Sequence, residues 1–450
     1  MAQAFTRVAA LGLLSVGCAA DDSDRAEDGG VGGGIGALTS GTGIETPQDG
    51  SDDALEPKLD VPDSDDGPGN GGDCNNGGGG GTDGDVEFTY IWIANSPEGT
   101  VSKIDTRTET ELARYYTGAS NGNDDPSRTA VNLAGDVAVT NRAGGIAKFA
   151  ADEERCVDRN NNGEIETSTG PADVLPFGQD ECWLWSAPLP GGNGLDNIEG
   201  PRPTAWDAGI DAADPCATSD DRVWVGWWEQ AADRGQFRRL SGVDGSTVDE
   251  VTVDSWSNGA LAARGPYGGA VDSDNDLWVT GLFDTLVRID GESLAVSRWS
   301  FPAEAQPYGI ALDANGHVWT AGYTGTVTHF DPTTEQFNTI PAGGVLRGIM
   351  VDRDGFAWAA KNDPCGLVQV DTATNTLIDA SIALPGCSVP VGVSIDIDGF
   401  VWVPDRGASL TYKLDTADYS TVTVTGLVEP YTYSDMTGAG LGLVFNPPQG

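Results

Sequence analysis

The chain has 450 residues, of which 24 are Lys or Arg and 69 are Asp or Glu, and its formal net charge is −45 at pH 7. This balance excludes a general nucleic-acid binder, because contact with a phosphate backbone needs a basic surface. It favours a strongly solvated protein outside the cytoplasm. The length is sufficient for a large hydrophobic core.

The first 18 residues are typical of an export signal. Arg7 precedes an apolar run at 8–17, which is too short to span a bilayer, and Cys18 follows it. Residues 14–18, LSVGC, resemble the lipobox of bacterial lipoproteins, in which the cysteine becomes the lipidated first residue after cleavage. The resemblance implies anchoring through Cys18 to the bacterial cell envelope, at the outer membrane or cell surface. An ordinary secreted protein is the alternative.

Residues 19–86 have the composition of a disordered linker. They hold 17 acidic residues against Arg25 and Lys58, many glycines and no aromatic residue. Such a segment cannot bury enough apolar surface to offset the entropy lost on ordering. We expect a flexible, self-repelling arm that holds the rest of the chain away from the membrane.

From Glu87 to the C-terminus the chain repeats one pattern of short strands. The clearest copy is 306–332, QPYGIALDANGHVWTAGYTGTVTHFDP. Its alternation predicts strands at 310–312, 317–321 and 324–330, separated by turns rich in Asp, Asn and Gly. A fourth strand is expected after the turn that follows.

A Trp in the second strand marks the repeat and predicts the fold. It falls at Trp92, Trp224, Trp278, Trp319, Trp358 and Trp402, and Ala138 takes the same place in one further unit. A period of about 40 residues with four strands per unit is typical of a propeller. We therefore predict an all-β fold, a seven-bladed β-propeller spanning residues 87–450, and we expect a monomer.

The two ends of the repeat region are complementary. The first unit lacks the inner strand, whereas residues 426–438, GLVEPYTYSDMTG, repeat only the inner-strand motif. The C-terminal segment is predicted to supply the missing strand and to close the ring, which leaves no exposed sheet edge there.

An insertion at 151–182 contains a candidate calcium loop. Oxygen-bearing side chains alternate and are followed by Gly and Ile, which resembles the calcium loops of EF-hands and dockerins. The predicted ligands are Asp158, Asn160, Asn162, Glu164 and Glu166. The twelfth place, where such loops carry Glu or Asp, is Thr169, so a bidentate ligand would come from Glu166 or elsewhere. We expect structural Ca²⁺; an Asn-rich turn is the alternative.

Six cysteines remain after Cys18, an even number that suits an oxidising compartment. Cys365 and Cys387 flank the last strand of the sixth blade and are predicted to pair. One disulfide is expected among Cys156, Cys182 and Cys216, the last of which lies in a second insertion at 208–222; the sequence leaves this pair open. Cys74, in the linker, is available for a third.

One face of the ring is predicted to bind a ligand. Loops before the first strand and between the second and third strands share this face, which we name the top face. The second position of the first strand gives Ser127, Arg202, Tyr267, Tyr308, Arg347, Val391 and Tyr431 around the channel. Arg and aromatic side chains suit an anionic or carbohydrate ligand, or a protein partner, through bidentate bonds and stacking.

The candidate ligand-binding residues include neighbours of this ring at the ends of second strands. The full set is Arg128, Arg142, Arg202, Tyr267, Tyr308, Tyr323, Arg347, Lys361, Asp405, Arg406 and Tyr431. The alternative is that these side chains bond to neighbouring blades and line a wet channel. The turns at 313–316, 352–355 and 396–399 recur once per blade, so we interpret them as turns and not as metal sites.

Three blade sequences, PYGIALDANGHVWTAG, GPYGGAVDSDNDLWVTG and PVGVSIDIDGFVWVPD, resemble the virginiamycin B lyase (streptogramin lyase) group and, more loosely, NHL and gluconolactonase-type propellers. In the lyases, elimination is attributed to His and Glu residues on one face, with Mg²⁺. Here the expected Glu position carries Gly281, Gly322, Lys361 and Asp405, and both His317 and His329 are expected at the opposite face.

No family base therefore maps onto this chain, although elimination requires one. We predict a cell-envelope lipoprotein whose propeller binds a ligand or a protein through its Arg- and Tyr-lined top face, with no catalytic residue assigned. A streptogramin lyase-like carbon–oxygen lyase and a structural envelope spacer are the alternatives.

Overall fold

The computed structural model describes residues 88–192, 197–211, 214–218, 221–257, 264–282, 285–445 and 447–448, without the side chains of 210–218 and 264. All of them belong to the unit 77–450. The export signal with Cys18, the linker and Cys74 lie outside the described residues.

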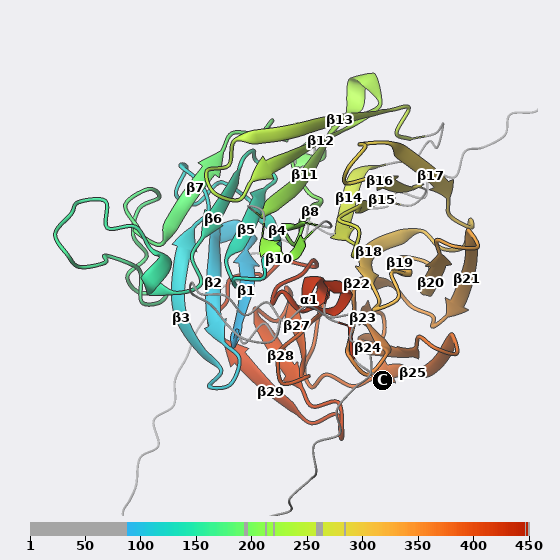
Figure 1. Ribbon diagram of the computed structural model, residues 1–450. Helices are drawn as coiled ribbons and strands as arrows, with labels where there is room; N and C mark the ends of the chain where they lie inside the picture. Colours follow the sequence, from blue (N-terminus) through green and yellow to red (C-terminus); the bar gives the residue numbers. More distant parts are fainter. Residues whose placement is uncertain are drawn as a thin grey trace, which may run out of the picture. The chain divides into compact units, whose positions relative to one another are not determined.

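Seven antiparallel sheets surround a common centre, which confirms the seven-bladed β-propeller (Figure 1). Blade one holds β1 (Tyr90–Asn95), β2 (Thr100–Asp105) and β3 (Thr110–Tyr116); blade two holds β4 (Pro126–Val131), β5 (Val137–Asn141), β6 (Ile146–Phe149) and β7 (Trp183–Ala187). Blade three holds β8 (Thr204–Trp206), β11 (Arg222–Glu229), β12 (Arg234–Ser241) and β13 (Thr247–Asp254).

Blades four to seven follow the same order from the channel outward. Blade four has β14 (Arg264–Val271), β15 (Leu277–Leu282), β16 (Thr285–Ile289) and β17 (Val296–Ser300); blade five has β18 (Pro307–Leu312), β19 (Val318–Gly322), β20 (Thr326–Asp331) and β21 (Gln336–Pro341). Blade six has β22 (Leu346–Val351), β23 (Phe356–Asn362), β24 (Cys365–Asp371) and β25 (Thr376–Ile382); blade seven has β26 (Ser394–Ile395), β27 (Val401–Asp405), β28 (Leu410–Leu414) and β29 (Thr421–Thr425).

The C-terminal segment closes the ring, as predicted. Asn95 and Pro430 form an antiparallel bridge, and the Tyr431 N–H donates to the Ala94 carbonyl at 2.9 Å. Further along, the Trp92 N–H donates to the Met436 carbonyl at 2.9 Å. Blade one therefore obtains its inner strand from the opposite end of the chain.

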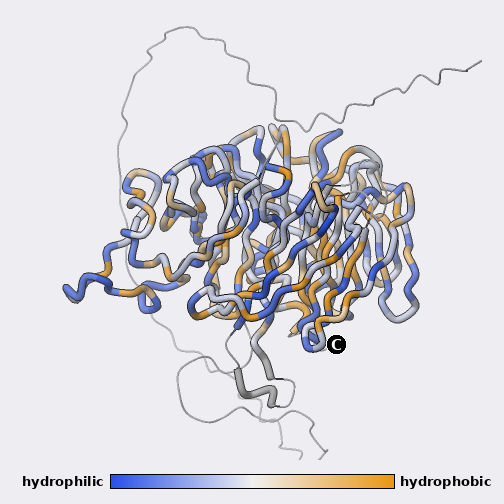
Figure 2. Tube along the Cα trace, turned by 90° about the horizontal axis from the view of Figure 1, so that it is seen from above, coloured by the Kyte–Doolittle hydropathy of each residue, from blue (hydrophilic) through white to orange (hydrophobic). Residues whose placement is uncertain are grey.

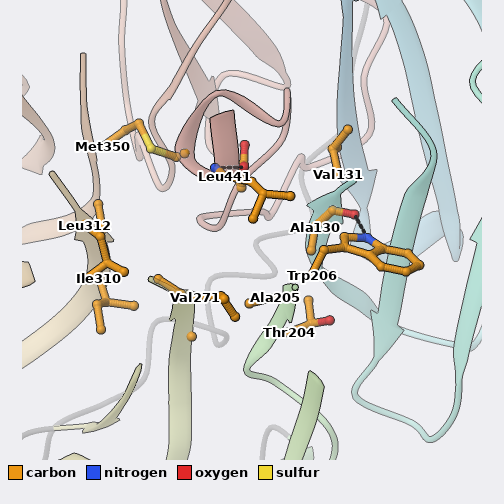
Figure 3. Close-up of a pocket in the computed structure, with 15 residues that line it drawn as sticks. Ala130, Val131, Thr204, Ala205, Trp206, Val271, Ile310, Leu312, Met350 and Leu441 are labelled. Carbon is orange, nitrogen blue, oxygen red and sulfur yellow. Dashed lines mark hydrogen bonds between the residues drawn. The ribbon is translucent and has the colours of Figure 1, made fainter. Parts of the chain in front are cut away.

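A short helix, α1 (Ala439–Phe445), follows this strand and lies at the centre of the ring (Figure 1). It packs where the first strands of the blades end, which is the bottom face. Between α1 and these strand ends is a cavity of about 40 Å³ (Figure 3). Its lining is mostly apolar and includes Ala205, Val271, Ile310 and Leu441. The helix thus covers the channel from below.

A repeated hydrogen bond explains the recurring Asp and Trp. In blade five the Trp319 indole donates to Asp313 Oδ2 at 2.9 Å, while Asp313 Oδ1 accepts the Asn315 and His317 N–H groups of the turn. The same indole-to-carboxylate bond joins Trp278 to Asp272, Trp358 to Asp352 and Trp402 to Asp396. Each carboxylate satisfies a buried indole and fixes a turn, which agrees with the turn interpretation.

Two disulfides lie within the described part of the chain. Cys365 pairs with Cys387 as predicted, and the pair that the sequence left open is Cys156 with Cys182. The bond between Cys156 and Cys182 closes the insertion at 151–182. This insertion is a largely hydrophilic loop that projects at the left of Figures 1 and 2. In the other insertion, β9 (Ile210–Asp211) and β10 (Asp214–Thr218) form a hairpin that the sequence did not predict.

The disulfides fit an extracytoplasmic compartment, where such bonds persist. Within the described ranges, no helix has the length and the apolar character needed to cross a membrane. The longest described helix, α1, has seven residues.

Candidate functional site

The strand register brings the predicted ring to the top face. Pro266 pairs with Gly281, Pro307 with Gly322, Leu346 with Lys361, Pro390 with Asp405, and Pro126 with Asn141. In each pair, the residue that follows the first-named partner belongs to the predicted ring around the channel. These residues are Tyr267, Tyr308, Arg347, Val391 and Ser127. The ring residues therefore lie at one level, at the channel mouth where the first strands begin.

Five tyrosines meet at this mouth. The ring centroid of Tyr308 lies 5.0 Å from that of Tyr267, 5.2 Å from Tyr323 and 4.6 Å from Tyr433. The hydroxyls of Tyr308 and Tyr431 share a hydrogen bond of 2.6 Å. Tyr308 is fully buried, whereas Tyr323 and Tyr431 are partly exposed. The tyrosines thus form a packed aromatic layer with two of its members facing solvent.

Arginines lie against the faces of these rings. The Arg128 guanidinium carbon is 3.0 Å from the ring centroid of Tyr433, and that of Arg347 is 5.3 Å from Tyr308. Arg202 lies 5.6 Å from the centroid of Tyr267. We name the whole group the mouth cluster; it comprises Arg128, Arg142, Arg202, Tyr267, Tyr308, Tyr323, Arg347, Tyr431 and Tyr433.

Arg128 is the most deeply buried cation of the mouth cluster, with 1% of its surface exposed. It donates to the carbonyls of Ser127 at 2.9 Å and Tyr267 at 3.3 Å, and its Nε has no partner among the described residues. Burial lowers the pKa of Arg128 to about 9, since the charged form is poorly solvated there. The folded protein therefore tolerates this charge at a cost.

Arg347 is 8% exposed and donates to the Tyr308 hydroxyl at 3.4 Å. The Asn362 amide lies beside it and, with its oxygen turned toward Arg347, accepts from Nε at 2.9 Å. Within the part of the chain that the structure describes, neither Arg128 nor Arg347 contacts a carboxylate.

The other two arginines have different surroundings. Arg142 forms an ion pair with Asp125, which outweighs the effect of burial and raises the pKa of Arg142. Arg202 donates to the carbonyls of Asn197 at 3.0 Å and Ile198 at 2.9 Å, among its other interactions. Burial lowers the pKa of Arg202. Among the described residues, Arg128 and Arg347 are therefore the mouth-cluster arginines whose hydrogen bonds all go to uncharged groups.

The positive charge of the arginines affects the pKa values of the neighbouring tyrosines. Burial alone would raise the pKa of Tyr431, but the guanidiniums of Arg142, Arg347 and Arg128 outweigh it and hold the pKa below its ordinary value. In Tyr308, the hydrogen-bonded partner, burial prevails and the pKa is well raised. The potential at Tyr431 is thus positive in a protein that is strongly acidic overall.

Three predicted residues lie outside the mouth cluster. Lys361 is buried within blade six and donates to the carbonyls of Ala342 at 3.0 Å and Ala380 at 2.7 Å. Asp405 is fully buried, and its oxygens accept backbone N–H groups, including that of Ser388 at 2.7 Å. Arg406 lies at the rim, 3.6 Å from Glu429, with its guanidinium carbon 5.7 Å from the ring centroid of Tyr431.

Sequence reasoning missed Tyr433, whose ring lies between Arg128 and Tyr308. Its hydroxyl has no partner among the described residues. The signal was present, because Tyr431 and Tyr433 are two residues apart on one strand and their side chains share a face. The position that repeats from blade to blade is that of Tyr431, so Tyr433 falls outside the repeat.

Hydrogen bonds between its own side chains and backbone close the predicted calcium loop. Asp158 accepts the Gly163 N–H at 2.9 Å, and the amides of Asn160 and Asn162 donate to the two carboxylate oxygens of Glu166 at 2.8 and 2.6 Å. Thr169, at the twelfth place, bonds instead to Asp173, and Glu164 is exposed. The assignment of Ca²⁺ to Asp158, Asn160, Asn162, Glu164 and Glu166 stays a prediction.

Another cluster of potential metal-ligating side chains, two cysteines and one aspartate, does not fit a metal ion. Cys365, Cys387 and Asp405 lie close enough for shared coordination. Both sulfurs are joined in the disulfide, and the Asp405 oxygens already accept three backbone N–H groups. The arrangement therefore serves the loop structure of blades six and seven.

Comparison with known proteins identifies the fold. No protein-family model matches the sequence, and no curated protein matches it. A functionally unknown protein from Desulfotomaculum acetoxidans is similar in structure at 11% identity, with a TM-score of 0.51 over 77% of this chain and 98% of that one. Virginiamycin B lyase from Staphylococcus aureus is similar at 14% identity, with a TM-score of 0.48 over 70% and 90%.

A streptogramin B lyase structure is similar at 16% identity, with a TM-score of 0.47 over 70% of this chain and 87% of that one. A virginiamycin B lyase and a streptogramin B lyase are thus among the similar structures, as the sequence resemblance predicted. At these identities the similarity concerns the β-propeller and does not extend to a ligand or a reaction.

Proposed function

We propose that the propeller is a binding module whose mouth cluster receives an anionic group of a small ligand or a protein partner. The observation that carries this proposal is the burial of Arg128 and Arg347 with no carboxylate beside either of them among the described residues. A buried cation without a counter-charge is costly, and a bound anion would supply that charge.

The chemistry of the mouth cluster favours a carboxylate or phosphate next to a ring-shaped group. Guanidiniums bind such anions through paired N–H donors. The rings of Tyr323 and Tyr431 are partly exposed and can contact a ligand. A uronic acid has this combination, because its carboxylate is attached to a sugar ring; an acidic residue beside an aromatic residue of a protein partner also has it.

The lyase alternative lacks a base at the position that the resemblance implies. Asp405 is the only carboxylate in that column, and three backbone N–H groups occupy its oxygens. His317 and His329 lie beyond the ends of the first strands, at the bottom face. General-base catalysis requires a group within reach of the substrate proton, so binding is the function that we propose for the top face.

We also propose, from the LSVGC motif, that Cys18 is lipidated and that the chain is held at the cell envelope. Replacement of Cys18 by Ser in the full-length precursor should move the protein from the membrane fraction to the soluble fraction and remove labelling by radioactive palmitate. Retention in the membrane fraction without label would contradict lipid anchoring.

Binding can be tested with D-glucuronate, citrate and inorganic phosphate by isothermal titration calorimetry. We expect at least one of them to bind, and Arg347→Gln to weaken that binding by tenfold or more, because it removes a charge at the mouth. The matched control is Arg234→Gln, which removes an exposed arginine paired with Asp254 on the outer part of blade three. Equal affinity in Arg347→Gln and the wild type, or no binding of any probe, would overturn the proposal.

A further inference from the structure

Arg347 is held at the channel mouth by the amide of Asn362. With its oxygen turned toward Arg347, this amide accepts from Nε at 2.9 Å and from Nη2 at 3.3 Å, and its nitrogen donates to the Pro390 carbonyl at 2.7 Å. Arg347 Nη1 donates to the Tyr308 hydroxyl at 3.4 Å. A guanidinium has five N–H donors, so these bonds orient the group and leave donors on both terminal nitrogens for an anion.

The bond from Asn362 to Pro390 joins two neighbouring blades. Asn362 is the last residue of β23 and pairs in register with Cys365, the first residue of β24. Pro390 lies in the loop between β25 and β26, three residues after Cys387. The Cys365–Cys387 disulfide connects the same end of the hairpin to the same loop, with its Cα atoms 6.1 Å apart. The covalent bond therefore lies beside the hydrogen bond and limits the separation of Asn362 from Pro390.

The loop has further anchors on the side of blade seven. The Asp405 oxygens accept the Ser388 and Val389 N–H groups at 2.7 and 2.8 Å, and the Val391 N–H donates to the Pro404 carbonyl at 3.0 Å. None of these bonds involves the hairpin of β23 and β24. Opening the disulfide should therefore loosen the loop from blade six and leave the strands of both blades paired.

This disulfide is also within reach of a reductant. Cys365 and Cys387 are both partly exposed, whereas Cys182 of the other described disulfide is 3% exposed. Thiol–disulfide exchange begins with attack of a thiolate on a sulfur, so access decides which bond opens first. A dithiol reductant breaks the sulfur–sulfur bond and supplies two electrons and two protons; the products are two cysteine thiols and the oxidised reductant.

We propose that the Cys365–Cys387 disulfide is a redox-sensitive support of the anion site and that Asn362 is the positioning residue through which it acts on Arg347. In the oxidised protein, the Asn362 amide is fixed between Pro390 and the guanidinium. After reduction the loop is free to move from the hairpin, the amide loses its acceptor, and the orientation of Arg347 is no longer fixed. This inference rests on the function proposed for the mouth cluster and gives that site a means of regulation.

The test compares two full-length variants by isothermal titration calorimetry with D-glucuronate, citrate and inorganic phosphate. The first carries Cys365→Ser and Cys387→Ser; the matched control carries Cys156→Ser and Cys182→Ser, which opens the disulfide in the insertion. We expect the first to weaken anion binding about fivefold or more and the control to change it less than about twofold. Asn362→Ala should weaken binding as the first variant does. Combining the two should add little, because both remove the same support.

Reduction of the wild type gives a second measurement without substitutions. Protein treated with increasing dithiothreitol is alkylated, and mass spectrometry of its peptides shows which cysteines have become thiols. Loss of anion affinity should follow the alkylation of Cys365 and Cys387 and precede that of Cys156 and Cys182. Affinity that is unchanged when Cys365 and Cys387 are fully alkylated, or fully additive losses in the combined variant, would overturn the proposal.

A third measurement separates this inference from the binding function itself. The ¹⁵N-labelled side-chain Nε–H signal of Arg347 can be assigned by its absence in Arg347→Gln. Without any ligand, this signal should shift or broaden in Asn362→Ala and in the variant lacking Cys365 and Cys387, and not in the matched control. If no probe binds, the function proposed for the mouth cluster fails. An Arg347 signal that is the same in these variants as in the wild type would refute the support by the disulfide.

Discussion

Arg128 lowers the stability of the unliganded fold at a position that suits the binding of an anion in the mouth cluster. Its guanidinium is buried, its Nε lacks a partner in the described structure, and burial lowers its pKa to about 9. Proteins often keep such groups where a ligand supplies the missing interaction, and replacing them stabilises the unliganded fold. The neighbouring contact with Tyr433 compensates for part of the lost hydration.

We predict that Arg128→Met raises the melting temperature of the protein in buffer free of multivalent anions at pH 7.5. Methionine fills a similar volume without a charge, and the expected gain is about 1–3 kcal/mol. Differential scanning calorimetry measures it. Arg234→Met, at an exposed ion pair, should change stability by less than about 0.5 kcal/mol. A clear loss of stability in Arg128→Met would show that the guanidinium stabilises the channel.

Asp207 gives a pH-dependent prediction. Burial raises its pKa to about 6, despite Arg222 and Arg239 nearby. Between about pH 4 and pH 6 the folded protein therefore holds more protons at this group than the unfolded chain, and its contribution lowers stability as pH rises through that window. This pKa shift corresponds to a destabilisation of the folded protein by about 3 kcal/mol at most. The destabilisation is fully present above pH 6.

Asp207→Asn should accordingly exceed the wild type in free energy of unfolding at pH 7 and match it near pH 4. The amide oxygen can still accept the Arg222 and Gly209 N–H groups. Urea titrations at pH 4, 5, 6 and 7 measure the difference. Asp398→Asn is the control, because its exposed ion pair with Arg107 lowers the pKa of Asp398 and gives no gain at pH 7. A constant difference across all four pH values would contradict the assignment to Asp207.

At the scale of elements, the inner strand of blade one is the weak point of the ring, because it comes from the far end of the chain. We predict that truncation after Gly426 abolishes cooperative unfolding, since blade one then exposes an unpaired edge. Truncation after Gly438 removes α1, with the buried Leu441, Leu443 and Val444, and the residues 446–450 that follow it. That variant should fold but melt at lower temperature, as circular dichroism can show. Equal melting of both truncations would contradict a specific role for the strand.

The loop at 158–166 gives a second element-scale prediction. If Asp158, Asn160, Asn162 and Glu166 bind Ca²⁺, EDTA should lower the melting temperature and Ca²⁺ should restore it, since a ligand that binds the folded state stabilises it. Glu166→Gln should remove most of this response. The control is Asp173→Asn, in the same insertion outside the loop. An unchanged melting temperature with and without EDTA would count against the site.

The blades could be predicted from sequence because most of them contain the same hydrogen-bonded turn between their first two strands. The Asp that bonds to the indole of Trp319 also closes a turn, so both residues recur at fixed spacing. Helix α1 could not be predicted, because AGLGLVF has two glycines in seven residues and owes its helical form to packing at the channel end. Its position depends on the ring already being closed.

The candidate site was predictable in its location and only partly in its geometry. The period of the strands placed Tyr308 and Arg347 at one level. It could not show that Lys361 reaches two carbonyls of its own blade, or that Tyr433 fills the space between Arg128 and Tyr308. Those outcomes depend on rotamers and on the width of the channel, which no linear pattern records.

At the scale of the whole molecule, a net charge of −45 surrounds a mouth whose buried side chains are positive. Like charges spread over the chain repel one another and destabilise the folded state, whereas salt screens surface charges over about 10 Å at 0.1 M. Buried groups such as Arg347 are screened much less. Added salt should therefore weaken the repulsion between surface carboxylates more than it weakens the attraction between the buried arginines and an anion.

We predict that raising NaCl from 10 to 500 mM increases the melting temperature, because repulsion between acidic residues is screened. The association rate of citrate or glucuronate should rise as well, since the acidic surface no longer repels the approaching anion. In a basic protein the same change slows association. Stopped-flow measurements at constant pH, with sucrose as an uncharged control, separate screening from general solute effects. A rate that falls steadily with salt would mean that the positive mouth governs the approach from a distance and that the acidic remainder has little influence on it.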